Sequence, residues 1–200
     1  MFLLEKLKKY HLLLASKSPR RQELLSQMGI TFSVCDSFVD EYVCQNVSTY
    51  KLAQSLAQQK AEAVFELYKN QENIIVIGGD TIVTHKEEIM GKPLDRSDAI
   101  RMLKILSGKQ HSVISGLCVI LHGQIHTAYD EAKVSFSELS ADDLTYYVDH
   151  YAPYDKAGAY GIQEWIGFRG IEHIEGSFFT IMGLPTHVLW QMLERLLNKK

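Results

Sequence analysis

The stretch LLASKSPRRQELL, residues 13–25, passes from apolar residues through hydroxyls and a proline into a basic, amphipathic segment. This order predicts a buried strand near Leu12–Ala15, a short loop and a helix from Pro19 to Met28. Ser18 is a suitable N-cap, and Pro19 suits the first helical position, where a missing N–H costs nothing. A strand that leads directly into a helix is the building unit of an α/β fold.

Two arginines, Arg20 and Arg21, fall in the first turn of this predicted helix. Cations are unfavourable there, because the helix dipole makes the N-terminus positive. One interpretation is a pair of solvated side chains balanced by Gln22 and Glu23. The other is a phosphate site, in which free N–H groups, a hydroxyl and two guanidinium groups bind an anion together. The residues alone leave both interpretations open.

The remaining pattern predicts alternating strands and helices, followed by two long paired strands. A continuous apolar run at Ile74–Ile77 is typical of a strand buried on both faces. Alternation followed by a long hairpin indicates a mixed central sheet with flanking helices, not a pure doubly wound fold. The other predicted elements are a strand at Thr31–Cys35, a loop at Phe38–Val47, a helix capped by Ser48 and ending near Lys69, a hairpin of Asp80–Thr84 with Glu88–Met90, a helix at Ser97–Leu106, strands at Ser112–Leu121 and Gln124–Ser137, a helix capped by Ser140 and ending near His150, a Gly- and Tyr-rich loop over Tyr151–Gly170, a strand at Ile171–Ile174 and a helix at Pro185–Leu197.

Length and composition predict a single globular domain over residues 1–200, with 1–11 as an extension before the first strand. The chain is 46% hydrophobic and 22% charged, with a net charge of −3, so no overall basic field attracts nucleic acid. No apolar run is long enough to span a membrane. The three cysteines form no CxxC pair, and the N-terminus lacks a signal-peptide pattern, which favours a cytoplasmic protein.

Asp80 is the strongest candidate for a catalytic residue. It follows the buried run Ile74–Ile77 and the pair Gly78-Gly79, and is therefore predicted to lie at a strand end, where α/β sheets present functional side chains. A carboxylate there could deprotonate water or hold a divalent metal. The alternative is a bend with a hydrogen-bonding aspartate and no catalytic role.

Charged candidates also lie in other segments. Lys92 is held in a turn by Pro93, Lys60 lies within the long predicted helix, and Glu41 lies in an acidic loop before it. A fixed ammonium group suits a phosphate as a point charge, although most lysines in turns are simply exposed. The motifs GxxxxGK[ST], GxGxxG and HExxH are absent, which excludes a P-loop, a Rossmann fingerprint and a helical zinc pair.

Residues 155–163, DKAGAYGIQ, alternate small and aromatic residues and end in the amide of Gln163. Small residues let a flat ring lie against the backbone, and an amide can both donate to and accept from a base edge. A tight structural turn is the alternative for this segment.

Taken together, these segments resemble the Maf-like family of nucleoside triphosphate pyrophosphatases over about Leu12–Leu197. The matching pieces occur in the family's order and at its spacing, which is more specific than any single motif. They are Leu14–Arg21, Gly79–Val83, Gly91–Pro93, Met102-Leu103 through Leu106–Gly108, Asp155–Gln163 and Gly183–Pro185.

The resemblance implies hydrolysis of a nucleoside triphosphate to the monophosphate and pyrophosphate, and a fold like that of the inosine triphosphatase group, with a cleft between two lobes. It also implies a divalent cation, Mg²⁺ or Mn²⁺, held by Asp80 and Glu41, and a possible homodimer. The resemblance implies that Asp80 is the proton acceptor and that Glu41, Lys60 and Lys92 are further charged groups of the site. It implies that Ser16, Ser18, Arg20 and Arg21 surround the triphosphate. It also implies that Arg20, Thr81 and Gln163 contact the nucleobase.

Within the family, residues 156–163 resemble the branch that acts on dTTP and UTP, not the branch that acts on N7-methylguanosine triphosphate. Gln163 can satisfy the imide edge of thymine or uracil, whereas cytosine would leave part of that edge mismatched. Two departures stand out: Glu164-Trp165 follow where glycine is common, and Lys17 replaces glycine or alanine. Modified pyrimidine triphosphates remain possible substrates. The alternative function is a nucleotide-sensing regulator of septum formation and cell division.

Overall fold

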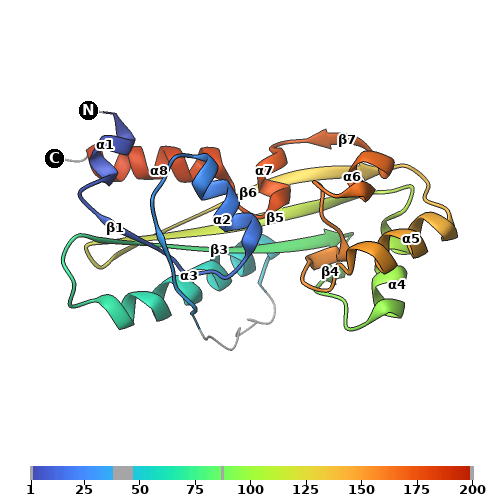
Figure 1. Ribbon diagram of the computed structural model, residues 1–200, viewed down its shortest axis with the longest axis horizontal. Helices are drawn as coiled ribbons and strands as arrows, with labels where there is room; N and C mark the ends of the chain where they lie inside the picture. The colour runs from blue at the N-terminus through green and yellow to red at the C-terminus, as the bar shows by residue number, and fades with distance from the viewer. Residues whose placement is uncertain (1, 38–46, 87, 199–200) are drawn as a thin grey trace. The chain divides into compact units, whose positions relative to one another are not determined.

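The computed structural model describes residues 2–37, 47–86 and 88–198 (Figure 1). Within these ranges the strands form one mixed sheet, which confirms the predicted α/β class. Its order is β2-β1-β3-β5-β6-β7, with β4 paired to β3. β1 is parallel to β2 and β3, whereas β4 is antiparallel to β3 and β7 to β6. The strands are β1 His11–Leu14, β2 Ser33–Val34, β3 Ile74–His85, β4 Glu88–Met90, β5 Gln110–Leu121, β6 Gln124–Phe136 and β7 Ile171–Glu175.

The longer helices lie within one or two residues of their predicted positions. They are α2 Pro19–Gln27, α3 Thr49–Tyr68, α4 Arg96–Leu106, α5 Ala141–Tyr151 and α8 Thr186–Asn198. Local signals explain their ends: Ser140 and Asp143 form a capping box at α5, and Gly29 follows α2 with φ +74°.

Four short elements were not predicted. The expected N-terminal extension contains α1, Leu3–Leu7, and the expected loop over residues 151–170 contains the 3₁₀ turn η1, Ala157–Ala159, and α6, Trp165–Gly170. The fourth is α7, Phe178–Met182. Each has six residues or fewer, too few for helical periodicity to show in a sequence.

The chain divides into two compact units. Unit 1 comprises Met1–Asp80, Ser115–Asp130 and Gly183–Lys200, and unit 2 comprises Thr81–Ile114 and Glu131–Met182. Strands β3, β5 and β6 cross these boundaries, so each of them contributes residues to both units.

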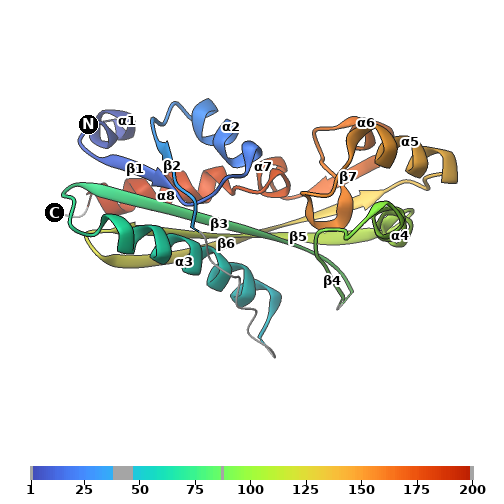
Figure 2. The same cartoon turned by 60° about the horizontal axis from the view of Figure 1, so that its bottom comes forward.

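In unit 1, helices α2 and α3 lie on opposite faces of β3 (Figure 2). Successive strand residues point to opposite faces, and two glycines show which helix each face meets. A Cβ added to Gly78 would lie 2.2 Å from the Ala57 carbonyl oxygen of α3, whereas one added to Gly79 would lie 3.2 Å from Nε of Arg21 in α2. The core on the α3 side contains Leu13, Ala15, Cys35, Ala57, Ala61, Val64, Ile74, Val76, Cys118 and Ile120.

Helices α1 and α8 of unit 1 pack against each other, and the ring of Phe2 lies 5.9 Å from that of Trp190. Lys6 near the end of α1 donates to the carbonyl oxygen of Leu197 at 3.2 Å. The first residues of the chain are therefore tied to its last helix.

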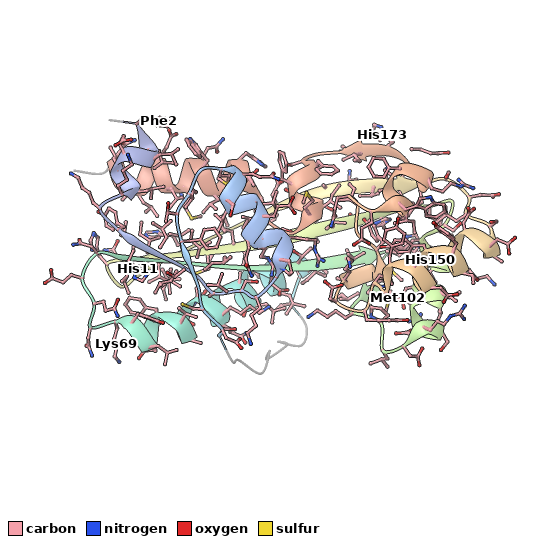
Figure 3. The ribbon with its side chains drawn as sticks, in the orientation of Figure 1. Phe2, His11, Lys69, Met102, His150 and His173 are labelled. Atoms are coloured by element: carbon pink, nitrogen blue, oxygen red, sulfur yellow. The ribbon has the colours of Figure 1, made fainter. Side chains whose placement is uncertain are left out.

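In unit 2, α4 packs against α5, and Figure 3 labels Met102, a buried residue of α4, and His150 of α5. His111 shares a 2.7 Å hydrogen bond with the hydroxyl of Tyr160. Burial lowers the pKa of His111 to about 3, so the imidazole is neutral at physiological pH.

No helix within the described residues is both long and apolar enough to cross a membrane.

Candidate active site

The carboxylate of Asp80 forms an ion pair with Lys60, with 2.5 Å between Oδ1 and Nζ. The pair is largely buried, since the two side chains are 12% and 13% exposed. The prediction that Asp80 lies at a strand end is wrong, because β3 continues through Gly78-Gly79 as far as His85. Asp80 is instead an interior residue of a long strand, with strand residues before and after it.

The glycines of the sheet explain how Lys60 reaches Asp80. Gly78 and Asp80 are two residues apart, so both face α3. Because Gly78 has no side chain, α3 approaches β3 closely, and Gly116 of β5 permits the same approach, since a Cβ there would lie 2.1 Å from the Ala53 carbonyl oxygen. Lys60 lies one helical turn after Ala57 and therefore meets Asp80.

The loop between β1 and α2 is held by Arg21. Its Nε donates to the carbonyl oxygen of Gly183 at 2.8 Å, and its Nη1 donates to Oγ of Ser16 at 3.1 Å. Arg21 and Ser16 are both only 9% exposed, so the interpretation of Arg21 as a solvated side chain is wrong. The same Ser16 hydroxyl accepts from the backbone N–H of Ser18 at 3.2 Å.

Ser18 and Arg20 are half-buried at the start of α2. Ser18 is the N-cap residue, as predicted, but its side chain forms no capping hydrogen bond. Lys17 is exposed and forms an ion pair with Asp36, just after β2. Two serines of the loop before α2 are thus followed by a half-buried and a buried arginine in the first turn of α2.

The Ser16–Arg21 pair and the Lys60–Asp80 pair both belong to unit 1, and both lie at β3. Gly79 precedes Asp80, and its Cα lies against the Arg21 side chain, where a Cβ would be 3.2 Å from Nε. The structure therefore forms two separate pairs, Ser16 with Arg21 on the α2 side of β3 and Lys60 with Asp80 on the α3 side. Glu41, the other predicted carboxylate, lies outside the described residues.

The remaining predicted residues belong to unit 2. Thr81 is half-buried in β3, and Lys92 is exposed in the segment between β4 and α4. Gln163 is half-buried, and its Oε1 is enclosed without a hydrogen-bond partner in the described part of the chain. A buried acceptor of this kind is costly unless something donates to it.

A backbone hydrogen bond joins the segment of Gln163 to the segment of Lys92. The N–H of Gly158 donates to the carbonyl oxygen of Gly91 at 3.1 Å. Gly158 has φ +69°, and a Cβ there would lie 2.9 Å from Cγ1 of Val83. A glycine is therefore required where the 157–159 turn packs on β3.

Sequence reasoning missed the buried polar groups around Gln163. Tyr147 of α5 and Lys156 both contact the carboxylate of Glu164, the residue after Gln163. From the sequence, Glu164 is notable only as a departure from the pattern of the family that the chain resembles. Lys156 follows a charged residue, Asp155, and no periodic pattern in the sequence predicts that it is buried. Tyr147 has the spacing of an ordinary core residue of an amphipathic helix.

Asp80 offers one carboxylate, whose oxygens are ligands of the kind that hard divalent cations prefer. No group of three or more metal-ligating side chains was found in residues 2–37, 47–86 and 88–198. Mg²⁺ is often held by one or two carboxylates together with substrate phosphates, and a single carboxylate is consistent with that pattern.

Comparisons with known proteins cover almost the whole chain. Residues 11–196 match the family described as Maf-like protein. A protein of Porphyromonas gingivalis named dTTP/UTP pyrophosphatase is 41% identical over 194 residues, covering 96% of this chain and 97% of its own length. One of Bacteroides fragilis with the same name is 43% identical over 195 residues, covering 97% and 100%.

Among solved structures, the Staphylococcus aureus Ham1 protein is similar over 63% of this chain and 71% of its own, with a TM-score of 0.42 and 13% identity. The match to the family extends from β1 to α8 and includes every described segment of the site. This chain belongs to the Maf-like protein family.

Proposed function

We propose that this protein is a nucleoside triphosphate pyrophosphatase that hydrolyses dTTP and UTP to the monophosphate and pyrophosphate. The relatives described above bear that name at 41% and 43% identity. The observation that carries the proposal is the buried Lys60–Asp80 pair at β3, where the residue before Asp80, Gly79, packs against Arg21. It combines an acid–base group with cationic groups suited to a polyanion.

We assign the triphosphate to the loop at the start of α2. Its backbone N–H groups and the hydroxyls of Ser16 and Ser18 can donate to phosphate oxygens, and the dipole of α2 favours an anion there. Arg20 and Arg21 supply positive charge, and a bound triphosphate would offset their otherwise unfavourable position in a first helical turn. We assign to Lys60 and Lys92 the neutralisation of the remaining negative charge of the triphosphate.

We assign to Asp80 the orientation and deprotonation of the attacking water. Lys60 binds Oδ1, so Oδ2 is the oxygen assigned to the water. The water oxygen attacks the α-phosphorus, the bond to the bridging oxygen breaks, and pyrophosphate leaves with the bond electrons. Most of the acceleration would come from positioning and charge neutralisation, as in other phosphoryl transfers.

Asp80, together with Glu41, would hold Mg²⁺ or Mn²⁺, which when bound would neutralise phosphate charge. For recognition of the nucleobase, we assign Gln163 to the imide edge of uracil or thymine, with Arg20 and Thr81 as further contacts. A homodimer and a cytoplasmic location stay predictions of the family resemblance. No observation favours the alternative of a regulator of cell division.

The test is pyrophosphate release from a panel of nucleoside triphosphates with Mg²⁺ or Mn²⁺, comparing wild type with Asp80→Asn. We expect release from dTTP and UTP that a chelator abolishes, and a kcat at least about a hundredfold lower in the variant, as for loss of a general base. Asp142→Asn, an exposed aspartate of α5, is the matched control and should keep full activity. Near-normal turnover by Asp80→Asn would contradict the role of Asp80 in deprotonating the attacking water.

A further inference from the structure

A buried polar network lies directly beside Gln163, within unit 2. Its centre is the carboxylate of Glu164, which accepts a hydrogen bond from the hydroxyl of Tyr147 through Oε2 and pairs with Nζ of Lys156 at 3.1 Å through Oε1. Tyr147 is fully buried, and the side chains of Lys156 and Glu164 are 9% and 19% exposed. Both carboxylate oxygens of Glu164 are therefore engaged away from bulk solvent.

The same network holds the backbone just before Gln163. The hydroxyl of Tyr147 accepts from the N–H of Gly161 at 3.0 Å, and the N–H of Glu164 donates to the carbonyl oxygen of Gly161 at 3.0 Å. Residues 161–164 thus form a closed turn with Gln163 at its third position. The chain cannot shift at Gly161 without breaking the bond to Tyr147.

Packing adds a second constraint on this turn. A Cβ on Gly161 would lie 2.8 Å from Cδ of Glu164, so the carboxyl group lies directly against the glycine backbone. Lys156 pairs with Asp155 at 2.7 Å as well as with Glu164, so its ammonium group lies between two carboxylates. The turn is therefore enclosed by side chains from α5 and from residues 155–156.

The protonation states agree with these contacts. Burial, followed by the hydrogen bond to Glu164, raises the pKa of Tyr147 far above its ordinary value, so the phenol keeps its proton. Tyr147 has one proton to donate, which goes to Glu164, and its oxygen accepts from Gly161. Each of these contacts of Glu164 and Tyr147 therefore pairs a donor with an acceptor, which favours a single arrangement of the turn.

We propose that Glu164 is a positioning residue that, with Tyr147 and Lys156, fixes the turn carrying Gln163 and thereby sets selectivity for the uracil or thymine edge. The proposal rests on the proposed function. It concerns how the turn that carries Gln163 is held, and not the hydrolytic step itself. Glu164 itself need not touch the base.

The experiment measures kcat and KM for pyrophosphate release from UTP and CTP, which differ at the edge assigned to Gln163. We expect Glu164→Gln to lower the UTP-over-CTP ratio of kcat/KM about tenfold, the effect of losing one or two hydrogen bonds to a charged group. We expect the lower kcat/KM for UTP to come from a higher KM, with kcat changed little. Tyr147→Phe, which removes the hydroxyl but keeps the ring, should change the ratio in the same direction.

A double-mutant cycle tests whether Glu164 acts through Gln163. Gln163→Leu should abolish the selectivity, and adding Glu164→Gln to it should change the ratio no further. Two controls match the variants in chemistry: Glu172→Gln, an exposed glutamate of β7, and Tyr151→Phe, one turn beyond Tyr147 on α5. Both controls should keep the wild-type ratio.

The outcomes separate the two proposals. If wild type releases no pyrophosphate from either nucleotide, the proposed function fails and this inference fails with it. If wild type prefers UTP but Glu164→Gln keeps the wild-type ratio, the inference alone is overturned, even if the variant unfolds at a lower temperature. An equal, additional loss of ratio in the Gln163→Leu background would also overturn it.

Discussion

At the scale of single residues, the two neighbouring arginines of α2 have different surroundings. Arg21 is buried and donates to the Gly183 carbonyl oxygen and to Ser16, whereas Arg20 is half-buried. A buried guanidinium that donates to a carbonyl and a hydroxyl stabilises the fold, because its removal deprives both acceptors of that donor. Arg21 therefore combines a structural role with the charge assigned to the phosphate loop.

We predict that Arg21→Ala lowers the free energy of unfolding by about 3 kcal/mol, from lost hydrogen bonds and a new cavity. Arg20→Ala should lower it by less than about 1 kcal/mol and act chiefly on KM for the triphosphate. Chemical denaturation and steady-state kinetics on both variants provide the measurements. Equal destabilisation by the two substitutions would contradict the difference in burial.

The sequence indicates these residue types but not their partners. Lys60 and Asp80 are 20 positions apart, and their pairing depends on how closely α3 approaches β3. Periodicity predicts both elements, but it cannot give the register of a helix on a sheet. For the same reason Gly183, which binds Arg21 across 162 positions, shows its structural role only in the folded chain.

At the scale of elements, the close packing of α3 on the sheet depends on glycines. We predict that Gly78→Ala lowers the free energy of unfolding by about 3 kcal/mol, because the new methyl group would overlap the Ala57 carbonyl oxygen, which it would approach to 2.2 Å. Displacement of α3 should also move Lys60 relative to Asp80 and lower kcat. Thermal unfolding and pyrophosphate release measure the two effects.

Gly91→Ala is the matched control for this prediction. A Cβ at Gly91 meets no atom within 4 Å, so its melting temperature should stay within about 2 °C of wild type. If Gly78→Ala were as stable as Gly91→Ala, the close approach of α3 to β3 would be excluded.

Among the elements, length decides what the sequence predicts. The 20-residue helix α3 and the capped helix α5 show clear periodicity and N-terminal signals, and both lie where predicted. The sequence predicts that a strand ends before Gly78-Gly79, because the continuous apolar run stops at Ile77. In the structure these glycines permit close packing within a continuous β3, a tertiary effect that no local pattern contains.

At the scale of the whole molecule, the two units share three strands. β3 contributes Ile74–Asp80 to unit 1 and Thr81–His85 to unit 2, and β5 and β6 are divided in the same way at Ile114/Ser115 and Asp130/Glu131. Unfolding one unit would therefore remove hydrogen-bonded neighbours along strands that continue into the other. Shared strands favour a single cooperative transition over two independent ones.

We predict that calorimetry of the full chain shows one transition, with a ratio of calorimetric to van't Hoff enthalpy of about 1. Gly78→Ala in unit 1 and Tyr147→Phe in unit 2 should each move that same transition to lower temperature, by about 2–4 °C for each kcal/mol lost. Two resolved transitions, of which each variant moves only one, would show that the shared strands do not couple the units. A single transition moved by both variants means that a substitution beside Gln163 also lowers the stability of the Lys60–Asp80 site. For that reason the selectivity ratio, and not activity alone, has to be the readout for Glu164.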